Sequence, residues 1–398
     1  MTINPSKTKG SITAPPSKSM AHRHIICAAL ADGRSSINNI DLSEDIKATI
    51  NCISQLGCRT EIENNSITIE RKGKVSDNPV FRCNESGSTL RFFIPIALVL
   101  CNKARFEGSD VLMTRPLSVY EDICREQGIR FERKNGGIEV EGRLRNNDFK
   151  VPGNISSQFI TGLLFALPLL EEDSSIELTE SVESRPYIDM TIQVLGEFGI
   201  TIEWKNERTL FIKGNQKYKG CTSTVEGDYS NAAFLEAFNT LGGEVEVKGL
   251  NPNSLQGDKV YQKHFKQLMN GFCTIDISDC PDLGPVLMAV AALHDGARFT
   301  GTRRLKIKES DRGSVMCQEL SKFGVSTEMA ENSITINKCE IKRPEEAVVS
   351  HNDHRIAMSM ALMLSVTGGR LEGSSAVRKS YPGFFDDIRK LGISITEE

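Results

Sequence analysis

The hydrophobic and polar positions of this 398-residue chain repeat in one order, six times. A helical segment with an apolar face ends at a glycine, and a strand with alternating apolar residues follows. The first instance is the helical pattern of residues 53–56, which ends before the strand pattern of residues 58–70. The terminating glycines are Gly57, Gly128, Gly199, Gly271, Gly324 and Gly392, so the successive spacings are 71, 71, 72, 53 and 68 residues. This nearly constant period is long for a solenoid and predicts a β-α-β-type unit repeated six times.

A polar turn precedes an apolar helical run in each repeat, in phase with the glycines. The turns are rich in Ser, Asp and Asn, which cap helices by accepting hydrogen bonds from free backbone N–H groups. They lie at residues 16–19, 84–89, 153–158, 227–231, 278–282 and 351–355. Helices that begin alike in equivalent units should run roughly parallel within each half of the chain. If two groups of three such helix starts face each other, their positive dipole ends form a strong trap for anions.

The first of these turns has the clearest anion-binding chemistry. Pro15-Pro16 cannot continue a helix from upstream, and Ser17 or Ser19 can serve as the N-cap. Lys18 and Arg23 then add positive charge where the free N–H groups and the dipole already point. Taken alone, the segment fits equally well a capped helix with a solvated lysine and arginine.

Three further clusters carry charge that could bind an anion or remain solvated. Lys308 and Arg312 lie at i and i+4, where like charges on one helix face repel each other. Residues 351–355 precede an amphipathic run, so Asp353 could be only a helix cap. Arg115 precedes a proline, which keeps its backbone extended and projects its side chain from a loop. For each cluster the residues alone leave both interpretations open.

Composition narrows the class of protein. With 39% hydrophobic and 25% charged residues the chain is an ordinary globular protein of two or three domains, and its net charge of −4 argues against binding nucleic acid or a membrane surface. The eleven cysteines include no C-x-x-C pair, so neither a disulfide framework nor a zinc site is indicated. The N-terminal residues do not form a signal peptide, and the longest apolar run, residues 92–101, is too short to span a bilayer. We therefore expect a soluble cytoplasmic protein.

Taken together, these segments resemble the enolpyruvyl transferases, and within that family the members that act on shikimate 3-phosphate. The match runs from about Gly10 to Pro382 and rests on nine ordered motifs. They are Pro16-Ser17-Lys18-Ser19-x-x-x-Arg23, Glu85-Ser86-Gly87-Ser88-Thr89-x-Arg91, Arg115-Pro116, Ser156-Ser157-Gln158-Phe159, Ser184-Arg185-Pro186-Tyr187, Pro281-Asp282, Lys308-Glu309-Ser310-Asp311-Arg312, Asn352-Asp353-His354-Arg355 and Lys379-Ser380-Tyr381-Pro382.

The resemblance implies an α/β (α+β) fold, a two-domain inside-out α/β barrel. Each domain would hold three of the six β-α-β-α-β-β units. The chain would begin in one domain, build the other and return, which gives a discontinuous domain of residues 1–15 plus 226–398 and an inserted domain of residues 16–225. The active site would lie in the cleft between these domains.

The implied reaction transfers the enolpyruvyl group of phosphoenolpyruvate to the 5-hydroxyl of shikimate 3-phosphate and releases phosphate through a tetrahedral intermediate. It belongs to the shikimate pathway to chorismate and the aromatic amino acids, and the herbicide glyphosate would occupy the place of phosphoenolpyruvate. Several cations must converge, because each pair of like substrate charges about 4 Å apart costs ~4 kcal/mol at an effective dielectric constant of 20. The resemblance implies no metal or cofactor, two small-molecule substrates as the only partners, and a monomer.

The resemblance also assigns roles position by position. Shikimate 3-phosphate would be bound by Lys18, Ser19, Arg23, Ser156, Ser157, Gln158, Ser184, Asp282 and Lys308. Phosphoenolpyruvate would be bound by Lys18, Gly87, Arg115, Gln158, Arg312, Arg355 and Lys379. Asp282 would accept the proton of the 5-hydroxyl, while Glu309 and Lys18 would manage the proton at C3 and the leaving phosphate. Glu85 and Arg304 stand where many members carry asparagine and are given no role.

Two alternative functions remain for a chain with these motifs. The nearer is the sister enzyme that transfers enolpyruvate to a UDP-sugar on the same fold, which would be expected to carry Lys-Asn in place of Lys18-Ser19 and a cysteine in a mobile loop. The Arg115 loop, residues 111–119, contains no cysteine. The other alternative is a non-catalytic anion-binding protein on this scaffold, and the presence of both Asp282 and Glu309 beside the cations argues against it.

Overall fold

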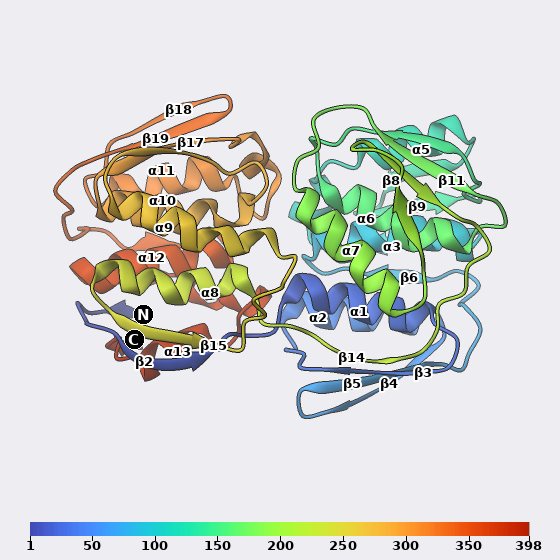
Figure 1. Cartoon of the computed structure of the whole chain (residues 1–398), viewed down its shortest axis with the longest axis horizontal. Helices are drawn as coiled ribbons and strands as arrows, with labels where there is room; N and C mark the ends of the chain where they lie inside the picture. The colour runs from blue at the N-terminus through green and yellow to red at the C-terminus, as the bar shows by residue number, and fades with distance from the viewer. Residues whose placement is uncertain (398) are drawn as a thin grey trace. The chain divides into compact units, whose positions relative to one another are not determined.

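The computed structural model describes residues 1–397 and divides into two compact units (Figure 1). Unit 1 comprises Met1–Pro15 and Gly227–Glu398, and unit 2 comprises Pro16–Glu226. Each unit has a hydrophobic core of its own. Within residues 1–397, no helix combines the length and the hydropathy that crossing a lipid bilayer requires.

Unit 2 carries three four-stranded sheets that are built alike. Its strands are β3 (Arg34–Asn38), β4 (Cys58–Glu63), β5 (Ser66–Arg71), β6 (Val80–Arg82), β7 (Lys103–Glu107), β8 (Arg130–Lys134), β9 (Gly137–Glu141), β10 (Asp148–Val151), β11 (Ser174–Leu178), β12 (Ile202–Trp204), β13 (Thr209–Ile212) and β14 (Thr222–Thr224). The strand orders are β14-β3-β5-β4, β6-β7-β9-β8 and β10-β11-β13-β12. In each sheet the first pair is parallel and the next two pairs are antiparallel.

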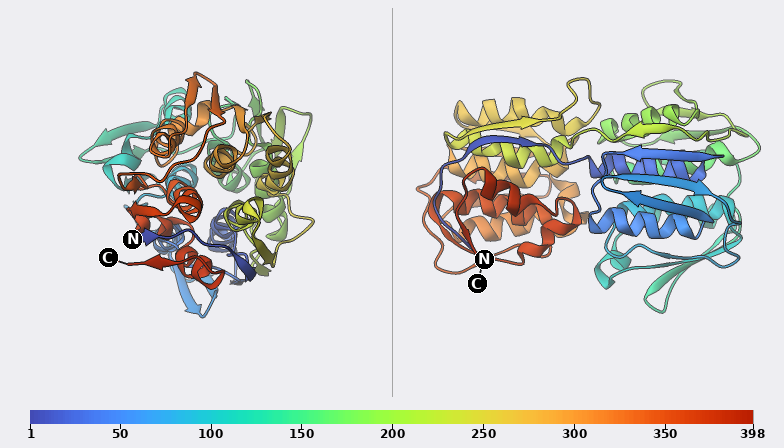
Figure 2. Two further views of the ribbon diagram at one scale, coloured as in Figure 1. Left: turned by 90° about the vertical axis from the view of Figure 1, so that its left-hand side faces the viewer. Right: turned by 90° about the horizontal axis from the view of Figure 1, so that it is seen from below.

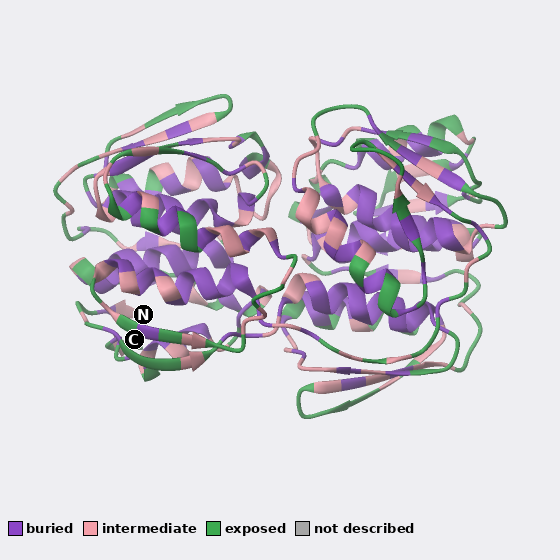
Figure 3. Cartoon of the chain, viewed as in Figure 1, coloured by how far each residue is buried: buried purple, intermediate pink, exposed green. Residues whose placement is uncertain are grey.

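The helices of unit 2 fall into inner and outer groups. They are α1 (Lys18–Leu30), α2 (Glu44–Ser54), α3 (Gly87–Leu100), α4 (Asp110–Thr114), α5 (Ser118–Glu126), α6 (Ser157–Ala166), the 3-10 turn η1 (Leu167–Leu169) and α7 (Arg185–Glu197). Helices α1, α3 and α6 are buried over most of their residues (Figure 3). Helices α3 and α6 are apolar on nearly every face, whereas α1 also buries His22, Arg23 and His24. Gly162 lets α6 approach α3, since a Cβ there would lie 2.5 Å from the carbonyl oxygen of Arg91.

The sheets of unit 1 include both ends of the chain. Its strands are β1 (Thr2–Ile3), β2 (Lys9–Thr13), β15 (Glu244–Lys248), β16 (Cys273–Asp276), β17 (Gly296–Thr300), β18 (Thr327–Ala330), β19 (Ser333–Asn337), β20 (Val348–Val349), β21 (Gly369–Glu372) and β22 (Ile395–Thr396). The strand orders are β16-β17-β19-β18, β20-β21-β1-β22 and β15-β2. In the second sheet β1 takes the position that β19 holds in the first, so an N-terminal strand completes the sheet of the last repeat.

The helices of unit 1 pack among its sheets, some in the interior and others partly exposed (Figure 2). They are α8 (Tyr229–Glu236), α9 (Tyr261–Met269), α10 (Gly284–Leu293), α11 (Arg312–Ser321), α12 (His354–Thr367) and α13 (Phe384–Lys390). Five 3-10 turns connect them: η2 (Ala237–Leu241), η3 (Gly257–Val260), η4 (Pro281–Leu283), η5 (Arg303–Ile307) and η6 (Ser374–Lys379). Helices α10 and α12 are buried almost throughout and form the centre of this core, whereas α9 and α13 are partly exposed.

The six repeats predicted from the sequence are present, with one variation. All six terminating glycines follow a helix and have positive φ angles, +82°, +68°, +79°, +115°, +83° and +106° in chain order, which a glycine adopts without strain. Five sheets have four strands, but β2 and β15 form a two-stranded sheet without the closing hairpin. Between Gly271 and α10 the described chain contains only β16, which accounts for the short spacing of 53 residues from Gly271 to Gly324.

Candidate active site

Arg312, the first residue of α11, is the centre of a buried ion network in unit 1. Its side chain is only 1% exposed. Nη1 donates to Asp282 Oδ1 at 2.9 Å, and Nη2 donates to Glu309 Oε2 at 2.5 Å. Nε donates to Asp353 Oδ2 at 2.8 Å. Burial by itself lowers the pKa of Arg312, but the carboxylates of Asp353, Glu309 and Asp282 outweigh burial and raise the pKa above its ordinary value.

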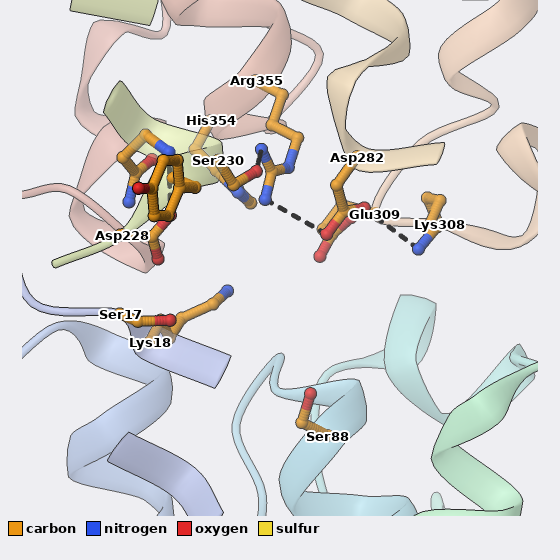
Figure 4. A network of polar contacts seen from close by, with 12 residues as sticks. Ser17, Lys18, Ser88, Asp228, Ser230, Asp282, Lys308, Glu309, His354 and Arg355 are labelled. Atoms are coloured by element: carbon orange, nitrogen blue, oxygen red, sulfur yellow. Dashed lines mark hydrogen bonds and ion pairs between the residues drawn. The ribbon is translucent and has the colours of Figure 1, made fainter. Parts of the chain in front are cut away.

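The carboxylate of Asp282, in the turn η4 before α10, forms ion pairs with three cations. Besides Arg312, Lys308 Nζ lies 3.0 Å from Oδ1 and Arg355 Nη2 lies 3.1 Å from Oδ2 (Figure 4). Burial raises the pKa of this carboxyl group, but the charges of Arg355, Lys308 and Arg312 outweigh burial and hold the pKa well below its ordinary range. Burial also lowers the pKa of Lys308, and the charge of Asp282 opposes that effect. While the three cations stay in place, Asp282 is a weak base.

The N-cap of α12 links three helix starts of unit 1. Asp353 accepts a hydrogen bond from the backbone N–H of Arg355 at 2.9 Å, and Ser310 Oγ donates to its Oδ2 at 3.0 Å. Arg355 in turn donates from Nη1 to Ser230 Oγ of α8 at 2.5 Å (Figure 4). Asp353 therefore caps α12 and at the same time holds Arg312. The sequence alone left open whether Asp353 is only a helix cap.

Lys379 reaches the same region through the backbone. It lies at the end of η6, and its Nζ donates to the carbonyl oxygen of Asn352 at 2.5 Å. Asn352 directly precedes the Asp353 cap, so the turn before α12 fixes the position of the lysine.

In unit 2, α1 begins with the predicted anion-binding turn. The N-cap is Ser17, whose side chain accepts from the backbone N–H of Met20. Lys18 Nζ forms an ion pair with Asp45 Oδ2 of α2 at 2.7 Å, and both side chains are mostly buried. No local pattern predicted this pair, because the two residues are 27 positions apart on different helices.

Arg23 lies further along α1 and binds α7 together with α1 itself. Its Nε donates to Thr191 Oγ1 at 2.9 Å, and its Nη2 donates to the carbonyl oxygen of Tyr187 at 3.0 Å. Nη1 donates to the carbonyl oxygen of Ser19 at 2.6 Å. Burial lowers the pKa of Arg23 to about 10. At the start of α7, Ser184 is fully buried and has a left-handed backbone with a φ of +57°.

The start of α3 is approached by two guanidinium groups. Ser86 caps the helix by accepting from the backbone N–H of Thr89 at 3.2 Å. A Cβ placed on Gly87 would lie 2.7 Å from Arg115 Nη1 and 3.1 Å from Arg91 Nη1. The bare glycine backbone therefore makes room for both cations beside the free N–H groups of this helix.

The start of α6 is joined to that of α3. Ser156 caps α6 by accepting from the backbone N–H of Gln158 at 3.3 Å, and Ser157 follows as the first helical residue. Gln158 Oε1 accepts from Arg91 Nη1 at 2.7 Å, and its Nε2 donates to Ser88 Oγ at 2.9 Å. Arg91 occurs in a predicted motif without a role, and here it links the two helix starts.

A buried chain of hydroxyl groups runs beneath these starts. Thr89 Oγ1 donates to Ser86 Oγ at 2.7 Å, and Thr49 Oγ1 lies 2.7 Å from Thr89 Oγ1. Since the hydrogen of Thr89 is used on Ser86, Thr49 donates to Thr89, and His22 Nδ1, 2.7 Å away, donates to Thr49. Burial and the charges of Lys18 and Arg23 lower the pKa of His22 well below its ordinary value. His22 is therefore neutral.

The structure places the predicted residues in two groups, one in each unit. Direct contacts join Asp282, Lys308, Glu309, Arg312 and Arg355 in unit 1, and Lys379 approaches them through Asn352. Unit 2 contains the predicted anion ligands Lys18, Ser19, Arg23, Gly87, Arg115, Ser156, Ser157, Gln158 and Ser184. In the part of the chain that the structure describes, no cluster of three or more His, Cys, Asp or Glu side chains could hold a metal ion.

Comparison with known proteins identifies what the chain is similar to. A family model described as EPSP synthase (3-phosphoshikimate 1-carboxyvinyltransferase) matches residues 3–388. The 3-phosphoshikimate 1-carboxyvinyltransferase of Clostridium perfringens (strain 13 / Type A) is 43% identical over 420 residues, covering 100% of this chain and 99% of the relative. The enzyme of that name from Clostridium kluyveri is 42% identical over 419 residues, covering 100% and 98%.

The fold also matches a solved structure. EPSP synthase from Acinetobacter baumannii superimposes with a TM-score of 0.79 at 22% sequence identity, over 100% of this chain and 99% of that one. This match concerns the arrangement of helices and sheets, and it agrees with the inside-out α/β fold expected from the sequence.

Proposed function

The chain belongs to the EPSP synthase family, and we propose that its two units divide the work of the family's reaction. It is a transferase that moves the enolpyruvyl group of phosphoenolpyruvate to the 5-hydroxyl of shikimate 3-phosphate and releases phosphate, a step of the shikimate pathway. A UDP-sugar acceptor is not favoured, since relatives that match the whole chain are named for the shikimate reaction.

Unit 2 binds anions in a site that is already built. Serine-capped helix starts offer free N–H groups, and a phosphate there is stabilised by the positive helix dipole and by nearby cations. Shikimate 3-phosphate is held from this unit by Lys18, Ser19, Arg23, Ser156, Ser157, Gln158 and Ser184. For phosphoenolpyruvate the same unit supplies Lys18, Gly87, Arg115 and Gln158. The closeness of Arg115 and Arg91 to Gly87 supports an anion at the start of α3.

The observation that carries the proposal is the carboxylate of Asp282 bound to both Arg312 and Arg355. These are the two guanidinium groups assigned to the carboxylate of phosphoenolpyruvate, and each can form two parallel hydrogen bonds with a carboxylate. In the free protein Asp282 occupies them. We infer that the substrate carboxylate takes over these partners when it binds.

This exchange activates the base. As Arg312 and Arg355 turn to the substrate, Asp282 loses the charges that hold its pKa down, and its pKa rises toward a range suited to accepting a proton. Each unit of that rise corresponds to about 1.4 kcal/mol of greater affinity for the proton. The protein thereby acquires a competent base only when phosphoenolpyruvate is bound. Lys308, the third partner, is assigned to the other substrate, shikimate 3-phosphate.

The chemical steps then follow with atoms in balance. When Arg312 turns to the substrate, Glu309 loses this cation and takes up a proton from water. The 5-oxygen of shikimate 3-phosphate bonds to C2 of phosphoenolpyruvate, its proton passes to Asp282, and Glu309 donates its proton to C3. In the second step the bond from C2 to the phosphate oxygen breaks, phosphate leaves beside Lys18, and Glu309 takes a proton back from C3. The proton on Asp282 leaves with the phosphate, Glu309 returns its proton to water, and the network is restored.

We also place the enzyme in the cytoplasm as a monomer that acts on free small molecules. All eleven cysteines are free thiols, which fits a reducing compartment. Burial raises the pKa of several of them, including Cys27 and Cys83, so these thiols are poor nucleophiles.

Phosphate release from phosphoenolpyruvate tests the function. We expect release with shikimate 3-phosphate, and none without an acceptor or with a UDP-sugar. The Arg355→Met variant tests the assigned roles, and it should raise the KM for phosphoenolpyruvate far more than the KM for shikimate 3-phosphate. Release with the UDP-sugar would refute the acceptor, and an unchanged KM for phosphoenolpyruvate would refute the carboxylate exchange.

A further inference from the structure

A buried carboxylate on α11 has no part in the mechanism above. Glu319 is fully buried, and three N–H groups donate to it. Lys322 Nζ lies 2.8 Å from Oε2, and the backbone N–H of Val349 donates to the same oxygen at 2.9 Å. His351 Nε2 donates to Oε1 at 2.7 Å, because a carboxylate can only accept. Two of these donors belong to the segment that leads into α12.

The segment held by Glu319 has a strained backbone. His351 and Asn352 are consecutive non-glycine residues with φ angles of +49° and +56°. This left-handed conformation is unfavourable for residues with a side chain, and it persists only where the surroundings hold it. On the other side of the segment, Ser350 donates from its backbone N–H to Glu372 O at 3.0 Å and from Oγ to Gly373 O at 2.8 Å.

The strained turn positions groups that are assigned to phosphoenolpyruvate. The carbonyl oxygen of Asn352 accepts from Lys379 Nζ at 2.5 Å. The next residue, Asp353, caps α12 and pairs with Arg312, and Arg355 follows in the first turn of the helix. If the turn relaxed to an ordinary backbone conformation, the oxygen that orients Lys379 would rotate away.

Helix α11 contacts this segment through two side chains of opposite charge, Arg312 and Glu319. Arg312 and Glu319 are seven residues apart, or about two helical turns, so both lie on one face of α11. Arg312 holds Asp353, and Glu319 holds His351 and the backbone of Val349. When Arg312 binds the substrate carboxylate, its contact with Asp353 weakens. Only the contacts of Glu319 with His351 and Val349 then keep the turn in place.

We propose that Glu319 is a positioning residue for phosphoenolpyruvate, which holds the turn at residues 351–352 so that Lys379 and Arg355 keep their places when Arg312 engages the substrate. The inference rests on the proposed function, because it takes the phosphoenolpyruvate roles of Arg312, Arg355 and Lys379 from there. Glu319 itself touches no substrate and acts through the turn.

Substitutions around Glu319 test this role. Glu319→Gln preserves the shape but cannot accept from all three donors. We expect the KM for phosphoenolpyruvate to rise about tenfold, since small displacements of binding groups cost this much or more. His351→Ala removes only the contact with the turn and should act in the same direction. The matched control is Lys322→Met, because Lys322 contacts Glu319 and the carbonyl oxygen of Ala347, both of which lie outside the turn at residues 351–352. It should lower the melting temperature without changing this KM.

Binding of shikimate 3-phosphate serves as the second readout. The only tryptophan is Trp204, and Cζ of Arg185 lies 4.1 Å from the centre of its ring. Arg185 directly follows the predicted ligand Ser184, so the fluorescence of Trp204 can report binding of shikimate 3-phosphate. The dissociation constant should stay within about twofold in all three variants, because the substituted side chains all belong to unit 1.

The outcomes separate the inference from the function it rests on. An unchanged KM for phosphoenolpyruvate in both Glu319→Gln and His351→Ala, while Arg355→Met raises it, overturns the positioning role alone. Equal weakening of both substrates, or the same KM change in Lys322→Met, also overturns it, since a general loss of stability would then explain the effect. An unchanged KM in Arg355→Met instead points to failure of the proposed function.

Discussion

The two units begin their helices from the same repeat but cap them with different chemistry. In unit 2 the caps of α1, α3 and α6 are Ser17, Ser86 and Ser156. Of the three corresponding helices in unit 1, α8 and α12 are capped by Asp228 and Asp353, and α10 has no side-chain cap. Both residue types accept a hydrogen bond from the first turn. A neutral serine keeps the positive field of the helix start, while an aspartate cancels it.

This difference divides the functions of the units. In unit 2, Arg91 donates to the side-chain oxygen of Gln158 and to the carbonyl oxygen of Pro116, and Lys18 forms an ion pair with Asp45. In unit 1, Arg312 and Arg355 are already bound to carboxylates, and a substrate must replace Asp282 to reach them. In the proposed function, unit 2 therefore offers serine-capped helix starts to an anion, whereas unit 1 exchanges one carboxylate for another.

The largest effect is expected at the carboxylate that unit 1 exchanges. Asp282→Asn removes the proton acceptor, and turnover should fall by roughly 10²- to 10⁴-fold, as is usual for loss of a general base. Binding of shikimate 3-phosphate, measured by equilibrium titration, should stay within about tenfold because most of its ligands lie in unit 2. Turnover at the wild-type rate would exclude Asp282 from the mechanism.

Exchanging a cap of one type for the other tests whether the charge of the cap determines anion binding. Ser156→Asp retains a capping oxygen but gives α6 the charged cap of unit 1, and Ser156→Asn is the matched neutral control. Two like charges about 4 Å apart repel by ~4 kcal/mol at an effective dielectric constant of 20, and solvent screening reduces this. We expect the KM for shikimate 3-phosphate to be about a hundredfold higher in the aspartate variant than in the asparagine variant. Equal constants would show that cap charge does not determine anion binding.

A smaller effect is expected at Gly87. The methyl group of Gly87→Ala would lie 2.7 Å from Arg115 Nη1, so this guanidinium must shift. Both ligands of this site should weaken, but glyphosate is longer than phosphoenolpyruvate and has less room to adjust. We expect the ratio of the glyphosate inhibition constant to the KM for phosphoenolpyruvate to rise about tenfold, or ~1.4 kcal/mol, in steady-state assays. A proportional loss for both ligands would place the inhibitor away from Gly87.

The smallest effect is a difference in how the units respond to acid. The folded pKa of His22 lies well below the ordinary value of 6.5, so the unfolded chain binds the proton more readily. The stability that neutral His22 contributes is complete above about pH 6.5 and is lost as the pH falls, by at most about 1.4 kcal/mol per pH unit. The pKa of Asp282 is lowered from 3.8, so its contribution is present above that value and lost only below it.

Burial also lowers the pKa values of His264 and His294 in unit 1, but the pKa of His22 is lowered further, so unit 2 should lose more stability between pH 6.5 and pH 5. Urea unfolding across this range would show it as a slope in the free energy of unfolding. His22→Asn keeps a donor for Thr49 without a titrating ring, and it should flatten that slope. An identical slope in the variant would assign the effect to other groups.

Local patterns in the sequence predicted the repeats well. A glycine that ends a helix needs only its own backbone freedom, so Gly57 and Gly324 could be recognised without any partner. The missing hairpin was visible only as a short spacing. The pairing of β1 with β21 and β22 left no signal, because two residues at one end of the chain cannot indicate partners nearly 400 positions away.

The contacts within the site were less predictable than its members. The motifs named Lys18, Asp282 and Arg312, but the sequence did not show that Asp45 neutralises Lys18 or that Asp282 occupies the arginines before the substrate arrives. Such pairs depend on how separate helices pack. Glu319 was missed for the same reason, since nothing around it in the sequence distinguishes it from a surface glutamate.

The position of β1 also orders events during synthesis of the protein. Thr2 and Ile3 leave the ribosome long before the strands that flank them, Gly369–Glu372 and Ile395–Thr396. Unit 2 is continuous and can fold as soon as Glu226 has emerged. In unit 1, β1 stays unpaired until β21 and β22 have been made. The inserted unit 2 can therefore fold before unit 1 completes its sheet.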